Sequence, residues 1–519
     1  MIGWSNPLLV APIVLPLFAG ALMLFFDDPR RSVRAGISLA AVIANLGLSL
    51  ASLLAADSSG VVTKVYLLGN WPAPFGIVLA LDRLSALMLL LTAVLATATL
   101  LFSLARWHRV GVYFHPLFQF LLAGLNGAFL TGDLFNLFVF FEVLLAASYG
   151  LVLYGGGIAR IRSGMHYIVI NLAASLLFLI GVSLIYGVTG TLNLSDIAAR
   201  VPMVAPGERV PLEAGAAILA IAFLVKAGMW PLSFWLPGAY AAAAAPVVAI
   251  FAIMTKVGIY AVLRLSLLLF GAGAGESAGL GAQVLLYGGM ATIAFGMLGV
   301  LAAQDMARMA GFAVLVSTGT LLAAIGADRV AVTAGALFYL ATSILALGAF
   351  YLVVELVERG REFGADMLAL TREIFGDPEE AGAGQEEDVG PRIPAVMAVL
   401  GVSFLTSALL IAGLPPLAGF VAKFAILSGL FRGSGPDSSI AGADWVLAAL
   451  LILSSLLVLI AMCRTGIRAL WSPEDREVPR VMVLEIAPVA GLLLVCVGLT
   501  IWAGPVMAYM EATARSLHD

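Results

Sequence analysis

Three lysines and one glutamate of this chain lie inside long apolar runs, where charged side chains are rare. They are Lys226, Lys256, Lys423 and Glu142. A charge at the centre of a bilayer costs from roughly 3 kcal/mol upward, so it is usually kept for a function. Lysine changes its protonation state readily when it is buried, whereas arginine stays charged. The four residues therefore predict groups that take up and release protons at membrane depth.

The use of lysine in the rest of the chain supports this interpretation. There are only four lysines, and Lys64 alone stands in an apparent loop. We expect Glu142 and Lys226 to pair, because each charge offsets the cost of burying the other. Making or breaking that pair would switch the proton affinity of Lys226. Lys256 and Lys423 would extend the pair into a water-bridged relay in the membrane plane. In the alternative interpretation, the charges only hold helices together.

Composition excludes soluble proteins. The chain has 519 residues, of which 62% are hydrophobic and 11% charged, whereas soluble domains carry about 25% charged residues. An all-α, polytopic membrane protein is therefore predicted. No nucleic-acid-binding stripe, phosphate-binding motif or redox-cofactor ligand set is visible, so we expect no bound cofactor. Cys463 and Cys496 both lie in apolar segments and indicate neither a disulfide framework nor a zinc site.

About 14 apolar segments are long enough to span a bilayer. Their approximate bounds are 7–26, 33–55, 78–104, 114–131, 134–154, 165–187, 212–235, 244–269, 280–302, 307–326, 331–357, 394–431, 441–470 and 481–507.

Prolines interrupt the seventh and twelfth of these segments, close to a lysine in each. Lys226 precedes Trp230 and Pro231, whereas Pro416 precedes Lys423. Paired interrupted helices in two halves of a transporter indicate inverted repeats around a transport site. We therefore predict two five-helix repeats with broken helices 7 and 12. The predicted parts are helices 1–3 (1–113), the first repeat (114–270), the second repeat (271–470) and helix 14 with the tail (471–519).

The connecting segments predict the orientation. Those after odd-numbered spans carry about twice as many lysines and arginines as the others, which places them in the cytoplasm and both termini outside it. Residues 189–213 are expected to contain a short interfacial helix. Residues 358–392 form the longest loop, on the cytoplasmic side, and their acidic middle is expected to be mobile.

Other polar residues are weaker candidates. His166, Thr318, Thr342 and Ser343 are possible accessory members of a polar path, although His166 also fits an interfacial position. We expect Asp133 to cap a helix.

Two further predictions concern charged residues near the ends of spans. Asp82 is expected to pair with its neighbour Arg83. Glu355 is expected to face water rather than a channel.

Several long motifs are specific enough to compare with known proteins. They are GNWPAPFGIVLALDRLSAL (69–87), TGDLFNLFVFFEVLLAASYG (131–150), FLVKAGMWPLSFWLPGAYAAA (223–243), TKVGIYAVLR (255–264), AQDMARMAGFAVLVSTG (303–319) and GLPPLAGFVAKF (413–424). These motifs resemble the antiporter-like subunits of respiratory complex I and of Mrp-type (Pha-type) cation/proton antiporters, and the D subunits of Mrp complexes most of all. The resemblance covers nearly the whole chain.

This resemblance implies 14 helices with two inverted repeats, the charged pair Glu142 and Lys226, the middle lysine Lys256 and the terminal lysine Lys423. Relatives often carry a histidine and a further lysine in the eleventh span. Thr342 and Leu347 stand there in this chain, so the step between Lys256 and Lys423 departs from the family pattern.

The function expected from these observations is proton translocation within a multisubunit Na⁺(K⁺)/H⁺ antiporter of the cell membrane. The partners would be a long A-type subunit, a C-like subunit and small membrane subunits, with H⁺ and Na⁺ or K⁺ as the ions. One alternative is a proton-pumping module of a redox complex, such as complex I or a membrane-bound hydrogenase. Another is a structural subunit that conducts nothing itself.

Overall fold

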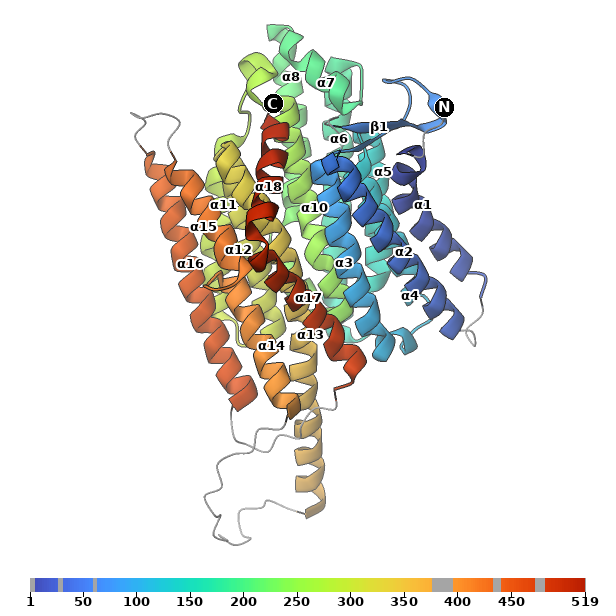
Figure 1. The fold of residues 1–519 in the computed structure, drawn as a ribbon, viewed down its shortest axis with the longest axis vertical. Helices are drawn as coiled ribbons and strands as arrows, with labels where there is room; N and C mark the ends of the chain where they lie inside the picture. Colours follow the sequence, from blue (N-terminus) through green and yellow to red (C-terminus); the bar gives the residue numbers. More distant parts are fainter. Residues whose placement is uncertain are drawn as a thin grey trace.

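The computed structural model describes residues 5–26, 31–58, 63–375, 395–432, 440–471 and 481–518. Its helices form an elongated bundle in which most axes run along the long direction (Figure 1). The first ten helices are α1 (Ser5–Met23), α2 (Arg31–Ser58), α3 (Arg83–Ala105), α4 (Phe114–Leu130), α5 (Leu134–Val152), α6 (Ile158–Thr189), α7 (Leu194–Arg200), α8 (Arg209–Ala227), α9 (Leu236–Ala242) and α10 (Ala245–Phe270).

The remaining helices complete the bundle. They are α11 (Ala282–Ala302), α12 (Met306–Gly326), α13 (Val330–Phe375), α14 (Ala395–Ala412), α15 (Ala418–Phe431), α16 (Gly442–Gly466), α17 (Val483–Ile501) and α18 (Ala503–His518).

Burial separates a central group of helices from a peripheral one. The most apolar stretch of α13 is 100% buried, whereas that of α17 is 33% buried. Large apolar side chains are exposed on the peripheral helices, among them Leu172, Leu176, Ile452, Leu456 and Leu494. Within the described residues, 12 helices are long and apolar enough to cross a membrane. The prediction of a polytopic, helical membrane protein is thus confirmed, while the count of 14 spans and the repeats stay predictions.

A small hairpin is the part of the fold that the all-α prediction missed. Strand β1 (Lys64–Leu67) pairs antiparallel with β2 (Val78–Leu81), and Lys64 lies opposite Leu81. The apolar composition of residues 78–81 predicts that they begin a span. In the structure they form strand β2 instead. They end at Asp82, whose side chain accepts a hydrogen bond from the Ser85 backbone and so begins α3.

Both proline-containing segments are interrupted, as predicted. The chain leaves α8 at Ala227, passes through turns, and forms the short helix α9 before α10 begins. In the second half, α14 ends at Ala412 and α15 starts at Ala418.

The two predicted loops had different outcomes. The segment 189–213 contains the short helix α7, as expected. The segment 358–392 is a loop only in part, because α13 continues to Phe375. A helix can extend beyond the membrane, and the prediction of a loop did not allow for this. The acidic stretch 377–388 lies outside the described residues.

The first and the last described residues of the chain lie toward the same end of the helical bundle. Figure 1 shows the C-terminus at the end of the molecule opposite to the extension of α13, and the start of α1 nearer that same end. The long helix α13 runs through the middle and packs against α10, α12, α15, α17 and α18.

Candidate proton-transfer site

Lys226 is located in the last turn of α8 and is only 5% exposed. The helix stops directly after it, because Gly228 adopts the left-handed conformation (φ 77°) and its N–H bonds back to Val225 O. Glycine commonly ends helices in this way. Pro231 lacks the backbone donor that a continuing helix would need. Lys226 thus stands in the last turn of α8, and the negative end of a helix dipole favours a cation in that turn.

Glu142 of α5 is the acidic group that acts on this lysine. The Lys226 Nζ lies 5.0 Å from the centre of the Phe141 ring, and Phe141 directly precedes Glu142 in the chain. The Glu142 carboxylate interacts electrostatically with Lys226. Among the described residues, neither Lys226 Nζ nor Glu142 Oε1 has a hydrogen-bond partner. The two charges thus interact without a direct bond, and their role as a functional pair stays a prediction.

Lys256 is fully buried in the middle of α10. Its Nζ donates a hydrogen bond of 2.8 Å to Ser317 Oγ of α12. The hydroxyl of Tyr339, on α13, interacts with the same serine. Lys256 therefore reaches two central helices through one hydroxyl group.

Thr318, the neighbour of that serine, connects α12 to the break after α8. Its hydroxyl donates to Ala227 O at 3.1 Å, and Ala227 follows Lys226 in the chain. The adjacent hydroxyls of Ser317 and Thr318 thus contact Lys256 and the residue next to Lys226.

Lys423 lies on α15, after the second break, and is 4% exposed. Its Nζ donates to Ala412 O, the last residue of α14, at 3.0 Å and to Ser455 Oγ of α16 at 2.7 Å. Gly413 follows Ala412 with φ 74°, and a Cβ there would meet Lys423 Cδ at 2.6 Å. The lysine therefore occupies the space against the end of the half-helix.

The two breaks share a backbone arrangement. The sequences KAGMWPL and IAGLPPL align at residues 226–232 and 411–417, and their glycines, Gly228 and Gly413, both have positive φ. At the second break the last carbonyl of α14 accepts a hydrogen bond from the Lys423 ammonium group, whereas at the first break Lys226 lies in the last turn of α8 and its ammonium group bonds to no carbonyl of the described residues. The lysine precedes the break in the first half and follows it in the second half. The similarity supports the predicted repeats.

The accessory candidates differ in position. His166 is exposed on α6, and its ring contacts Arg162 O, which fits the interfacial alternative. Thr342 and Ser343 are buried on α13, where their hydroxyls donate to carbonyls of their own helix. Both lie about one turn from Tyr339, on the helix that packs between α12 and α15.

Sequence reasoning missed three hydroxyl groups at this site. Ser317 and Ser455 each accept a hydrogen bond from a buried lysine, and Tyr339 contacts the first of them. Ser317 stands beside Thr318, which is among the predicted accessory residues. Apart from that adjacency, an isolated serine in an apolar helix gives no signal of its partner.

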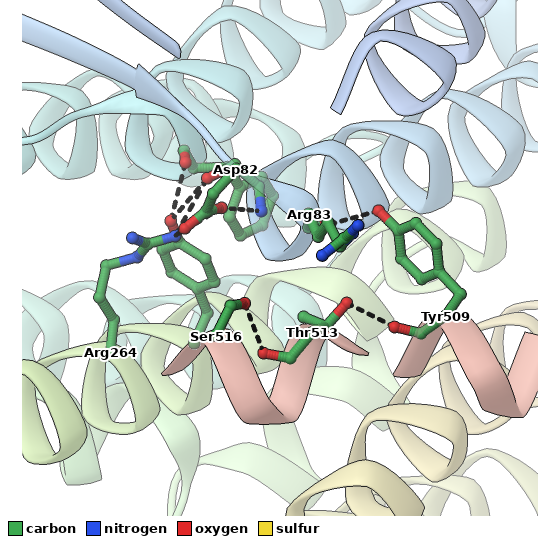
Figure 2. A network of polar contacts seen from close by, with 9 residues as sticks. Asp82, Arg83, Arg264, Tyr509, Thr513 and Ser516 are labelled. Atoms are coloured by element: carbon green, nitrogen blue, oxygen red, sulfur yellow. Dashed lines mark hydrogen bonds and ion pairs between the residues drawn. The ribbon is translucent and has the colours of Figure 1, made fainter. Parts of the chain in front are cut away.

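A second polar cluster lies where α3 begins, and it corrects one prediction. Asp82 pairs with Arg264 of α10 at 2.7 Å, whereas its neighbour Arg83 contacts Asp57. Figure 2 shows the Asp82 carboxylate facing the Arg264 guanidinium, and the Tyr509 hydroxyl of α18 pointing to the backbone of Arg83. Adjacent residues at a helix start project differently, so Asp82 reaches a distant helix rather than Arg83. Burial by itself would raise the pKa of Asp82, but Arg264 and the Ser85 amide outweigh it and hold the pKa below its usual value.

Asp133 caps α5, as expected, by accepting a hydrogen bond from the Asn136 backbone. Glu355 is less exposed than predicted. Its side chain is 14% exposed because Trp107 Nε1 and Arg359 donate to it.

These observations define a polytopic helical membrane protein with buried lysines at two interrupted helices. The family model described as NADH:quinone oxidoreductase/Mrp antiporter, TM, matches residues 131–449. The chain belongs to this family.

Individual relatives and a solved structure agree with this assignment. The D subunit of a probable K(+)/H(+) antiporter of Rhizobium meliloti is 56% identical over 522 residues, which cover 100% of this chain and 96% of that protein. The D subunit of a Na(+)/H(+) antiporter of Alkalihalophilus pseudofirmus is 34% identical, with 99% and 98% covered. A chain in the structure of the Mrp complex from a Dietzia species has the same fold, with a TM-score of 0.83 at 24% identity and 100% and 98% covered.

Proposed function

We propose that this chain is the proton-translocating membrane component of a multisubunit Na⁺(K⁺)/H⁺ antiporter. The observation that carries the proposal is the burial of three lysines within the helical bundle. Two of them are linked through α12, since Lys256 bonds to Ser317 and the residue after Lys226 accepts a hydrogen bond from the adjacent Thr318. The names of the relatives, which are antiporter D subunits, support it. The chain would act as part of a secondary transporter and not as an enzyme.

The proposed path starts at Glu142 and Lys226, continues through Ser317 and Thr318 to Lys256, and ends at Lys423. Each lysine holds its proton against a weak partner, a carbonyl, a hydroxyl or an aromatic ring, rather than in a tight ion pair. A proton on such a group can leave when a neighbouring charge changes, because no strong bond must be broken.

Between Lys256 and Lys423, the proposed route follows α13. Tyr339, Thr342 and Ser343 lie on this helix, which packs against both α12 and α15. Water held by these hydroxyls would replace the histidine that relatives often carry in this span.

The driving force is the membrane potential together with the proton gradient. Moving one charge through 100 mV is worth roughly 2.3 kcal/mol. The entry of protons can thus drive the exit of cations when more protons enter than cations leave.

The complex would be located in the plasma membrane, with both termini of this chain outside the cytoplasm. Its partners would be a long A-type subunit, a C-like subunit and small membrane subunits.

Everted vesicles that contain the complete complex test this function. We expect added Na⁺ or K⁺ to dissipate a preformed pH gradient, and the double replacement of Glu142 and Lys226 by leucine to abolish the response. If the charges only hold helices together, the double variant would keep exchange, because a well-packed apolar pair can replace a buried ion pair.

A redox-driven pump is the second candidate, because the matching family includes NADH:quinone oxidoreductases. Isolation of the complex from native membranes decides between the two. Iron–sulfur or flavin subunits that copurify with this chain would favour the pump and contradict the antiporter.

A further inference from the structure

A groove with a volume of about 480 Å³ lies between α15 and α18. Both helices pack on α13, and the first turns of α13 form the floor of the groove. Figure 1 shows that α18 leads to the end of the bundle where the C-terminus lies. The proposed proton path uses none of the residues that line this groove.

Small side chains keep the groove open. Ala334 of α13, Ala425 of α15 and Ala503 of α18 are among its lining residues. Gly504 also lines it, and a Cβ added there would meet no atom within 4 Å. The described part of this chain therefore leaves the space between the two helices unfilled.

The groove is polar at one end and apolar along the rest of its length. Arg432 directly follows α15, and Glu511 and Arg515 lie in the second half of α18. Further along the groove, the lining changes to Val421 and Met507. A molecule that fills the groove must therefore be amphipathic.

The length of the groove matches one leaflet of a bilayer. Val421 and Arg432 are 11 positions apart, which corresponds to about 16 Å along a helix axis. The hydrocarbon core of a bilayer is about 30 Å thick, so one leaflet contributes about 15 Å. With the charged end at the membrane surface, the apolar end thus lies near the middle of the bilayer.

The charges at the polar end have both signs. Arg515 pairs with Glu511 one turn earlier at 3.4 Å, although the two side chains are 69% and 45% exposed. An exposed pair of this kind is weak, so a ligand can replace it easily. The guanidinium groups of Arg432 and Arg515 suit a phosphate group, because arginine donates two parallel hydrogen bonds. The Glu511 carboxylate suits an ammonium group.

We propose that this groove binds one phospholipid with a zwitterionic headgroup of the phosphatidylethanolamine type. The phosphate contacts Arg432 and Arg515, the ammonium group contacts Glu511, and an acyl chain lies in the groove against α13. The inference goes beyond the proposed function, because the lipid site exists whether or not the chain conducts protons.

The bound lipid supports α15 on the side that faces away from Lys423. The lysine donates to Ala412 O and Ser455 Oγ, which belong to α14 and α16. Val421 and Ser428 line the groove, and at about 3.6 residues per turn they project nearly opposite to Lys423. A lipid in the groove therefore packs on the free side of this half-helix and holds the lysine against its partners.

Photo-crosslinking tests the site in the complete, purified complex. The probe is phosphatidylethanolamine with a diazirine in one acyl chain, and the labelled peptides are mapped. We expect labelling of α15 and α18 around Phe424 and Met507, which both line the groove. Unlabelled phosphatidylethanolamine should displace the probe at about tenfold lower concentration than phosphatidylglycerol, equal to about 1.4 kcal/mol, because phosphatidylglycerol has the phosphate but no ammonium group.

Three results of this experiment would overturn the proposal. The first is labelling spread evenly over exposed helices such as α6. The second is labelling of a partner subunit in place of α15 and α18, which would show that protein covers the groove. The third is equal displacement by the two lipids, which would remove the zwitterionic headgroup from the assignment.

Substitutions test the headgroup and the acyl chain separately. Arg432→Gln combined with Arg515→Gln should lower labelling to the same tenfold extent, whereas Arg200→Gln, which breaks a similar pair on α7, should not. Gly504→Phe should fill the groove and exclude the probe. Gly491→Phe is its control, because Gly491 lies on the exposed face of α17 with open space around it. Unchanged labelling in both groove variants would contradict the site.

Exchange in vesicles tests the support of α15. Gly504→Phe should slow cation-dependent proton movement several-fold relative to Gly491→Phe, and equal rates would contradict that support. The lipid site and the proposed function can fail separately, because labelling reports the site alone. Full exchange in a Lys226 variant would reject the proposed function and leave the labelling pattern unchanged.

Discussion

The Lys256 ammonium and the Ser317 hydroxyl form a 2.8 Å hydrogen bond that joins the centre of α10 to α12. Both groups are buried, at 0% and 2% exposure. Ser317→Ala would remove this acceptor and leave the ammonium group with one fewer partner, which costs about 1–3 kcal/mol. We expect a lower unfolding temperature of the purified complex and slower exchange in vesicles.

Ser407→Ala is the matched control, because Ser407 is also buried but donates only to the carbonyl one turn back in its own helix. An unaltered exchange rate in Ser317→Ala would show that this contact does not serve the path.

Lys423 has two partners, so loss of one should have a smaller effect. Ser455→Ala removes the 2.7 Å bond and leaves the bond to Ala412 O. The expected cost is about 0.5–1.5 kcal/mol, seen as a several-fold slower exchange. Its neighbour Ser454 is buried and bonds to its own helix, so Ser454→Ala should behave as the unmodified chain. Equal rates for both variants would exclude a role for Ser455.

Gly413 is predicted to be intolerant of a side chain for two reasons. Its φ of 74° is unfavourable for alanine, and the added Cβ would lie 2.6 Å from Lys423 Cδ. Gly413→Ala should therefore cost more than about 1 kcal/mol and displace the lysine from the end of α14. Gly238 has open space around it, so Gly238→Ala serves as the comparison in the same exchange and thermal-unfolding assays. A normal exchange rate in Gly413→Ala would show that exchange does not require Lys423 to lie against the end of α14.

The Asp82–Arg264 pair is expected to matter for stability. Both side chains are largely buried, at 13% and 14% exposure, and Asp82 also caps α3. Asp82→Asn should destabilise by about 3–5 kcal/mol, because it leaves a buried guanidinium unpaired. Asp57 is 60% exposed in its contact with Arg83, so Asp57→Asn should cost less than about 1 kcal/mol.

The pH dependence of this effect follows from the pKa of Asp82. Arg264 and the Ser85 amide outweigh the effect of burial and hold this pKa below its ordinary value of 3.8. A lowered carboxyl pKa contributes stability that is present above the unfolded-state pKa and is lost as the pH falls through the folded-state value. The stability gap between the unmodified chain and Asp82→Asn should therefore be full near neutral pH and narrow below about pH 4. A gap that widened in acid would contradict this account.

Much of the fold could be predicted because the bilayer imposes strong rules. The positions of apolar spans, and the breaks at Pro231 and Pro416, follow from length and from the missing proline donor. The hairpin around Lys64 and Val78 could not be separated from a span by apolar composition. The extension of α13 to Phe375 was missed because a polar helix outside the membrane shows no hydropathy signal.

At the site, the charged residues were predictable but their contacts were not. Lys226, Lys256 and Lys423 stand out since charge is costly in a membrane. The contacts of Ser317 and Ser455, and the identity of the partner of Asp82, are set by which helices pack together. The types of these residues in the sequence do not indicate that packing.

The exchange rate of a Lys226→Met variant tests the central claim most directly. Met keeps an apolar stem of similar shape and removes only the charge and the proton site. The matched control is Lys64→Met in β1, outside the buried helices. In everted vesicles with equal amounts of assembled complex, we predict that Lys226→Met loses cation-dependent proton movement while Lys64→Met retains it. Full exchange in Lys226→Met would contradict the account.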